Sequence, residues 1–294
     1  MIIPIRYEGD YPLTIHLLIT SKCNFNCPEC FYKRGDGELP EKTVSTWLHQ
    51  WKGIVRSLAI GGGEPFLYEP LPRIIAQAKE CGMFVAVTTN GSILPSKKDF
   101  PVVPDRIHIS YDDVHPLKKK QAIKAIRHFR DMEVKSIGIN HIVTNTKDFA
   151  DAYSLLKEDI NKITLLLKKP IAGKGTKKVI DKVLTLIDDN SHIFWFDPCL
   201  WKTMNISEKT AVIKQCDQGK ISMCIDYKGR ASICSNSKDY VEYTNLSDTW
   251  AKVKTIVCPL DKKPSLNLKE VKNRKGTMLV VEKTSYLNQE GSNI

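Results

Sequence analysis

The chain has 294 residues, 42% of them apolar, enough to bury the core of one large domain or of a barrel with a small second domain. Its net charge is +11, but the lysines are dispersed and not interleaved with aromatic residues, so nucleic-acid binding is not expected. Because no run of about 18 apolar residues and no secretory signal pattern occurs, we expect no membrane span and a cytoplasmic location.

Apolar runs alternate with helical patterns along the first two thirds of the chain. We expect strands at about 13–20, 57–61, 84–89, 106–111, 136–144, 163–168 and 192–196. We expect helices at about 40–52, 70–82, 116–132, 148–159 and 176–189. This alternation predicts right-handed βαβ units, and therefore an α/β fold whose parallel sheet curls into a partial or full barrel. In such barrels the chemistry lies at the carboxyl ends of the strands.

The pattern changes near Cys199. Two apolar segments, 221–227 and 230–234, flank Lys228-Gly229 and predict a β-hairpin. Residues 245–256 predict a short amphipathic helix behind a polar cap. The remainder is lysine-rich, with one strand-like segment at 277–281. We therefore divide the chain into a core at 1–198, a small hairpin and helix module at 199–258, and a basic tail at 259–294.

Three of the nine cysteines follow the first expected strand with C-x3-C-x2-C spacing: Cys23, Cys27 and Cys30. Three thiolates can hold three irons of a [4Fe–4S] cube and leave the fourth iron open. A disulfide framework would need paired cysteines, and a structural zinc site would need four ligands. This spacing therefore favours an iron–sulfur cluster with a free coordination position.

Gly61-Gly62-Gly63-Glu64-Pro65 follows the second expected strand. Together with the cysteine spacing, this segment resembles the radical S-adenosylmethionine (SAM) enzymes over roughly residues 10–258. The resemblance implies a (β/α)6 partial barrel in which the three cysteines hold a SAM-binding [4Fe–4S] cluster. It also implies that Gly61, Gly62, Gly63 and Glu64 receive the amino group of SAM. By the same resemblance, polar residues at the next three strand ends are cofactor contacts: Asn90, Ser110 and Asn140.

A second cysteine pattern lies in the expected C-terminal module: Cys216-x12-Gly229-x4-Cys234, followed by Cys258. It resembles the twitch or SPASM module, which carries an auxiliary cluster in radical SAM enzymes. The hairpin would return Cys216 and Cys234 to one end, and the short helix would deliver Cys258. The resemblance implies a second [4Fe–4S] cluster, although zinc also suits thiolates. Its fourth ligand stays open between Cys199, Cys224 and a substrate.

The resemblance further implies reductive cleavage of SAM to a 5′-deoxyadenosyl radical, which abstracts hydrogen from a substrate. A flavodoxin- or ferredoxin-like protein would donate the electron. The auxiliary cluster would accept an electron from the substrate radical and make the reaction an oxidation.

The resemblance leaves two substrate classes open. Related modules act on peptides and on small metabolites such as aminosugars and nucleotides; we favour a peptide or protein and keep the metabolite as an alternative. The chain begins at the barrel without a leader-binding winged helix, which argues against leader-dependent modification. The rival from another class is a non-catalytic metal- or RNA-binding protein. It is disfavoured by Gly61–Pro65 after a strand and by the lack of stacking aromatics.

Overall fold

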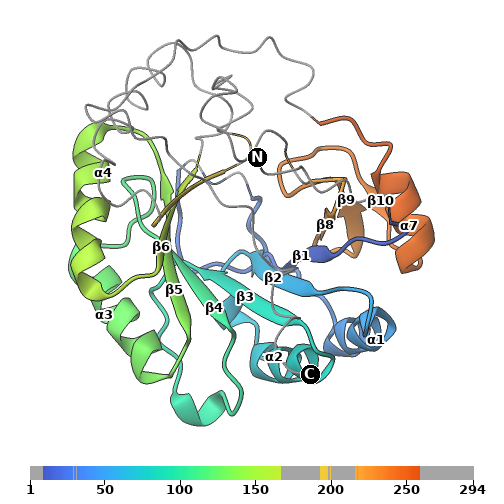
Figure 1. The fold of residues 1–294 in the computed structure, drawn as a ribbon, viewed down its shortest axis with the longest axis horizontal. Helices are drawn as coiled ribbons and strands as arrows, with labels where there is room; N and C mark the ends of the chain where they lie inside the picture. Colours follow the sequence, from blue (N-terminus) through green and yellow to red (C-terminus); the bar gives the residue numbers. More distant parts are fainter. Residues whose placement is uncertain are drawn as a thin grey trace, which may run out of the picture.

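The computed structural model describes residues 9–28, 30, 32–166, 193–197, 199, 216 and 218–258. Within these residues the strands form one ten-stranded sheet in the order β10-β9-β8-β1-β2-β3-β4-β5-β6-β7. Neighbouring strands from β1 to β7 are parallel, and β8 also pairs with β1 in parallel. Figure 1 shows that the sheet curves and that the helices line its outer side. The expected partial α/β barrel is confirmed.

The elements alternate as the sequence predicts. The strands of the barrel are β1 (Thr14–Thr20), β2 (Ser57–Gly62), β3 (Phe84–Thr89), β4 (Arg106–Ser110), β5 (Ser136–Ile142), β6 (Lys162–Leu166) and β7 (Phe194–Phe196). The helices between them are α1 (Glu41–Trp51), α2 (Leu71–Glu80), α3 (Lys119–Asp131) and α4 (Thr146–Tyr153), the last followed by a 3-10 helix, Ser154–Glu158. Short 3-10 turns also occur at Pro65–Leu67 and Lys97–Asp99.

The last part of the described chain adds β8 (Ser222–Ile225), β9 (Arg230–Ser232), β10 (Val241–Glu242) and α7 (Leu246–Val253). The hairpin β8–β9 and the helix match the expectation, and Asn245 caps α7 by accepting a hydrogen bond from the Asp248 amide at 2.9 Å. Strand β10 was not expected. Because β8 is hydrogen-bonded to β1, the expected C-terminal module shares its sheet with the expected core.

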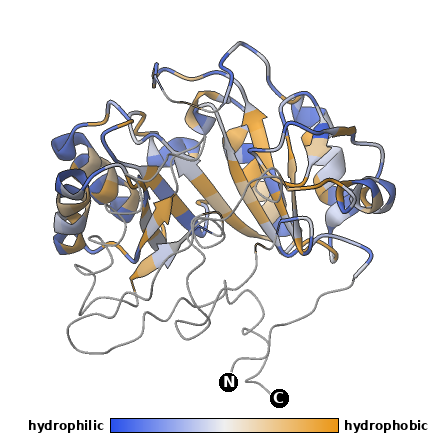
Figure 2. Ribbon diagram, turned by 90° about the horizontal axis from the view of Figure 1, so that it is seen from above, coloured by the Kyte–Doolittle hydropathy of each residue, from blue (hydrophilic) through white to orange (hydrophobic). Residues whose placement is uncertain are grey.

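Strand periodicity separates two faces of the sheet. On β4 and β5 the residues Ile107, Ile109, Ile137 and Ile139 are at most 1% exposed and belong to the core beneath the helices. This face meets the buried stripe of α3, which includes Ile126 and Phe129. Figure 2 shows the hydrophobic residues concentrated in the strands. The intervening residues include the polar Arg106, His108, Ser110 and Asn140, and they face the inside of the partial barrel, since successive strand side chains point to opposite faces.

Several expectations lie outside the described residues: the helix at 176–189, the strand at 277–281 and the tail at 259–294. Among the residues that the structure does describe, no helix is long and apolar enough to cross a membrane.

Candidate functional site

The motifs singled out in the sequence meet at one edge of the sheet. The cysteine loop follows β1, Gly63 and Glu64 follow β2, and Asn90 follows β3. Ser110 ends β4, and its register partner on β5 is Asn140. Because all these strands are parallel, their carboxyl ends lie at the same edge, where α/β barrels carry their chemistry.

The glycines of the second motif allow a close approach to the cysteine loop. The amide of Gly63 donates to the Thr20 carbonyl, and the amide of Glu64 donates to the Lys22 carbonyl, both at 2.7 Å. A Cβ atom at Gly63 would overlap the carbonyl of Lys22. Gly62 adopts a φ of +122°, in the region that favours glycine. The end of β2 therefore runs directly beside the chain that leads into Cys23.

Glu64 joins β2 to β3 through a fully buried side chain. One carboxylate oxygen accepts from the Thr89 hydroxyl at 2.8 Å and the Phe66 amide at 3.1 Å, and the other accepts from the Asn90 amide at 2.7 Å. Burial raises the pKa of Glu64 to about 7, although these hydrogen bonds oppose the rise. In this structure the carboxylate is thus engaged by the chain's own donors.

Asn90 connects Glu64 to the first cysteine. Its side-chain nitrogen donates to the Asn24 side chain at 2.9 Å and lies 3.8 Å from the Cys23 sulfur. Its side-chain oxygen accepts from the amide and the hydroxyl of Ser92, at 2.9 and 2.6 Å. The expected role of Asn90 was a cofactor contact; the structure places it against the loop that carries the three cysteines.

The first three cysteines are free thiols that neighbour one another. Burial raises the pKa of Cys27 to about 11, and the nearby charges of Cys30 and Cys23 add to the rise. Burial also raises the pKa of Cys23. In the described part of the chain, no three His, Cys, Asp or Glu side chains converge closely enough to hold a metal ion. The three thiols match a cluster with three thiolate ligands in residue type and in their order along the chain. Binding of the cluster would draw the three thiols together.

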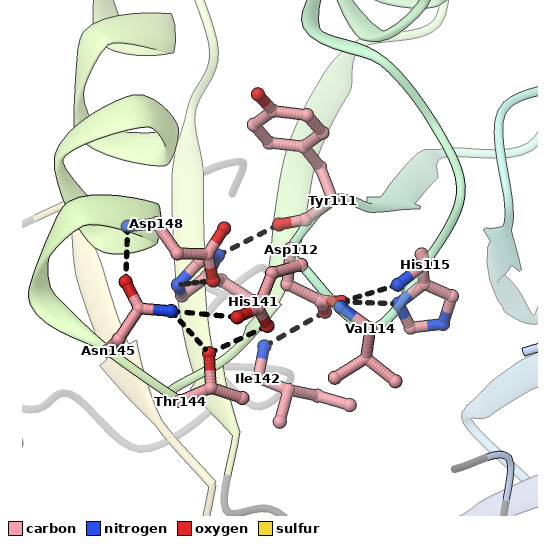
Figure 3. A network of polar contacts seen from close by, with 10 residues as sticks. Tyr111, Asp112, Val114, His115, His141, Ile142, Thr144, Asn145 and Asp148 are labelled. Atoms are coloured by element: carbon pink, nitrogen blue, oxygen red, sulfur yellow. Dashed lines mark hydrogen bonds and ion pairs between the residues drawn. The ribbon is translucent and has the colours of Figure 1, made fainter. Parts of the chain in front are cut away.

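A network of polar contacts fixes the loops after β4 and β5 (Figure 3). The buried Asp112 carboxylate accepts from the His115 ring at 2.7 Å, from the amides of Val114 and His115 at 3.0 Å, and from the Ile142 amide at 3.1 Å. Burial opposes ionisation of Asp112, but its hydrogen bond to His115 and the other contacts hold its pKa below the usual range. The charge of Asp112 also acts on Cys27, so this network lies near the cysteine loop. Neither His115 nor its bond to Asp112 was foreseen.

His141 belongs to the same region and is fully buried. Its Nδ1 donates to the Tyr111 carbonyl at 2.8 Å, and its Nε2 lies 3.3 Å from an Asp148 oxygen. His141 is therefore a hydrogen-bonded core residue.

In the described part of the chain, Cys234 and Cys258 lie within electrostatic reach of Cys216, but the three side chains do not converge closely enough to hold a metal ion. Burial raises the pKa of Cys216 to about 12, and the charges of Asp197, Cys234 and Cys258 raise it further, so these groups are neighbours. Cys224 is buried on β8, and its raised pKa reflects burial first and then the charge of Cys234. Cys199 donates its amide to the Asp197 side chain at 3.2 Å. Both candidates for a fourth ligand therefore lie near the set: Cys224 beside Cys234, and Cys199 beside Asp197.

Comparison with known proteins identifies relatives of this architecture. The family model of the radical SAM superfamily matches residues 17–157. The Fe-coproporphyrin III synthase of Methanosarcina barkeri is 24% identical over 227 residues, which cover 70% of this chain and 55% of that protein. The S-adenosylmethionine-dependent nucleotide dehydratase of Selenomonas ruminantium is 30% identical over 111 residues, covering 35% of this chain and 40% of that protein. The chain thus spans about half the length of the curated relatives it matches.

The solved structures agree on the fold. SuiB of Streptococcus suis, bound to its precursor peptide SuiA, superposes with a TM-score of 0.67 at 18% identity, covering 84% of this chain and 67% of SuiB. The matched family segment, residues 17–157, contains the cysteine loop, the glycine motif, Asn90, Ser110 and Asn140. Residues 17–157, just under half of the chain, therefore form a radical SAM domain.

Proposed function

We propose that this protein cleaves SAM reductively and uses the resulting 5′-deoxyadenosyl radical to oxidise a peptide or protein substrate. The observation that carries the proposal is that a loop with three free thiols, the glycine motif and Asn90 lie together at the carboxyl edge of a parallel partial barrel. A [4Fe–4S] cluster on Cys23, Cys27 and Cys30 would supply the electron for this cleavage and an open iron for SAM.

The chain's own residues would orient the cofactors. Glu64 holds Asn90 by its amide, and Asn90 holds the loop of Cys23, so the glycine motif and the cysteines keep a fixed spacing. Ser110 and Asn140 are adjacent across β4 and β5, and we assign them to SAM together with the backbone of Gly61, Gly62 and Gly63. The curved sheet would shield the reaction from water on one side.

The second cysteine set supports an auxiliary cluster. After burial, the charges of Cys234 and Cys258 contribute to the raised pKa of Cys216, which supports their grouping around one cluster. An auxiliary cluster at this place would take up the electron released when a substrate radical is oxidised. The fourth ligand would come from Cys224, from Cys199 or from the substrate.

Two similarities bear on the substrate class, one of fold and one of sequence, and they favour different substrates. The fold likeness to SuiB, a protein solved with a precursor peptide, supports a peptide. The sequence relatives named for a nucleotide and for GTP support a small metabolite as the second candidate. A flavodoxin- or ferredoxin-like protein of the cytoplasm would be the electron donor.

The decisive experiment counts iron and sulfide after anaerobic reconstitution of the wild type and of two variants. One variant replaces Cys23, Cys27 and Cys30 by Ala, and the other replaces Cys216, Cys234 and Cys258. We expect about eight irons in the wild type and about four in either variant, one [4Fe–4S] cluster being lost from each. About four irons in the wild type, unchanged by the second variant, would remove the auxiliary cluster.

A matched control and a product assay complete the test. Cys81 lies at the end of α2, outside both cysteine sets, so Cys81→Ala should keep all the iron. With SAM and dithionite the wild type should form 5′-deoxyadenosine, and the variant lacking Cys23, Cys27 and Cys30 should form none. S-adenosylhomocysteine in place of 5′-deoxyadenosine, or a colourless zinc-containing protein, would refute the proposal.

A further inference from the structure

A row of polar residues crosses the inside of the barrel below the candidate SAM contacts. In the sheet register His108 of β4 pairs with Gly138 of β5, and Gly138 pairs with Lys162 of β6. The next row toward the carboxyl edge consists of Ser110, Asn140 and Thr164. Two residues along a strand span about 7 Å, so the His108–Lys162 row lies about that far beneath Ser110 and Asn140.

Gly138 lets the His108 imidazole lie across the neighbouring strand. A Cβ at Gly138 would stand 2.7 Å from Cδ2 and 3.1 Å from Nε2 of His108, and 3.2 Å from the Lys162 carbonyl. The Nε2 atom is buried and has no hydrogen-bond partner among the described residues. Burial, and then the charges of Lys162 and Arg106, lower the pKa of His108, so its ring is neutral and keeps one N–H to donate.

Lys162 brings a cation to the same row. The residue is 8% exposed, and its Nζ lies 3.6 Å from the centre of the Trp195 ring. Within the described chain no carboxylate lies within ion-pair distance of this ammonium group; its charged neighbour is Arg106. Thr164, one row above, has a buried hydroxyl without a hydrogen-bond partner in the described part of the structure.

Lys162, His108 and Thr164 all present groups that an anion can satisfy. A buried ammonium without a counter-ion is costly, and buried polar atoms without partners in a native fold require an explanation such as a bound ion or water. A single oxyanion between Lys162, His108 and Thr164 would neutralise the cation and accept from the imidazole and the hydroxyl. The cation–π contact with Trp195 offsets part of the cost of Lys162 but supplies no acceptor for His108 or Thr164.

We propose that His108, Lys162 and Thr164 form an oxyanion-binding site inside the barrel, which takes a phosphate or carboxylate group of the substrate. The binding of an anion at this site does not depend on the proposed function. The assignment of that anion to the substrate rests on the proposed function. A substrate held there by its charged group would extend toward the carboxyl edge, where Ser110 and Asn140 lie.

The test is a calorimetric titration of the anaerobically reconstituted protein with inorganic phosphate and, separately, with acetate, at pH 7 and constant ionic strength. We expect one saturable site for at least one of the two anions, which also tells phosphate from carboxylate recognition. Lys162→Met should weaken binding at least tenfold, and Thr164→Val several-fold. Lys98 is exposed, so Lys98→Met removes the same charge elsewhere and should leave binding unchanged.

The proposal fails if neither anion binds the wild type, or if Lys162→Met and Thr164→Val both bind as tightly as the wild type. If Lys162→Met does not fold, as judged by its iron content and melting temperature, Thr164→Val alone decides whether the site exists. This substitution replaces the hydroxyl by a methyl group and so preserves the size of the side chain. Anion binding needs no radical chemistry. Iron content and 5′-deoxyadenosine formation on the same preparations therefore separate a failure of this site from a failure of the proposed function.

Discussion

Replacing Lys162 by Met should stabilise the protein, and by an amount that depends on pH. Burial, and then the charge of Arg106, lower the pKa of Lys162 from 10.5 to about 7. Since the unfolded chain keeps the higher pKa, it binds the extra proton between pH 7 and 10.5, and the folded state loses stability as the pH falls through this range. The side chain therefore costs about 4 kcal/mol at pH 7 and about 2 kcal/mol at pH 9.

Met keeps the length of the lysine stem but carries no charge, so it removes this cost. We expect the unfolding free energy of Lys162→Met to exceed that of the wild type by about 2 kcal/mol more at pH 7 than at pH 9. Packing differences between Lys and Met do not depend on pH, so they cancel when the stability difference at pH 7 is compared with that at pH 9. His108, whose pKa is lowered well below 6.5, stays neutral at both values.

The measurement is guanidinium chloride unfolding of both proteins, reconstituted under anaerobic conditions, followed by tryptophan fluorescence at pH 7 and 9. Lys98→Met, at an exposed position, serves as the control and should show no such pH dependence. If wild type and Lys162→Met respond equally to pH, or if the variant is less stable at pH 7, Lys162 is not a buried uncompensated cation and the reasoning is wrong.

Three further outcomes follow from the site. Gly63→Ala should abolish stable iron loading, measured as iron per chain, because its Cβ would overlap the Lys22 carbonyl; an Ala variant that loads fully would contradict this close approach. Glu64→Gln should weaken SAM binding more than it lowers the melting temperature, because its amide nitrogen cannot accept from the Asn90 amide; unchanged affinity in an equilibrium titration would speak against that link. Iron loading should improve from pH 7 to pH 8.5, because the pKa of Cys27 is raised to about 11 and its proton must leave; loading that falls over this range would overturn the argument.

Much of the fold could be predicted from the sequence because the pattern is regular. Apolar strands of five to seven residues alternate with amphipathic helices, and this order admits few arrangements besides a parallel sheet. The boundaries of α4 were less predictable. The expected helix at 148–159 starts earlier, at Thr146, because Asn145 caps it, and it ends at Tyr153 in a 3-10 turn. Local capping decides such boundaries, and hydrophobic periodicity does not register it.

The cysteines and the glycine motif could be found because their spacing is local in the sequence. The roles of Asp112 and Lys162 could not, because each depends on a residue of another strand that only the sheet register brings close. One signal was present: Arg106, His108 and Lys162 are charged or titratable residues at strand positions that alternate with apolar ones. That pattern marks the inner face of the barrel, but it does not reveal that His108 and Lys162 share a row across Gly138.

Two buried carboxylates hold the carboxyl edge of the barrel together. Parallel strands have no hairpin between them, so side-chain hydrogen bonds help to fix the loops that follow neighbouring strands. Glu64 fixes β2 to β3 through the Asn90 amide, and Asp112 fixes the loop after β4 to β5 through the Ile142 amide. The two carboxylates lie near different cysteines: burial is the main cause of the raised pKa values of Cys23 and Cys27, and the charges of Glu64 and Asp112, respectively, add to them. The residues that set the shape of the site therefore also favour the protonated thiols, so iron loading must displace protons from a site whose loops are already fixed.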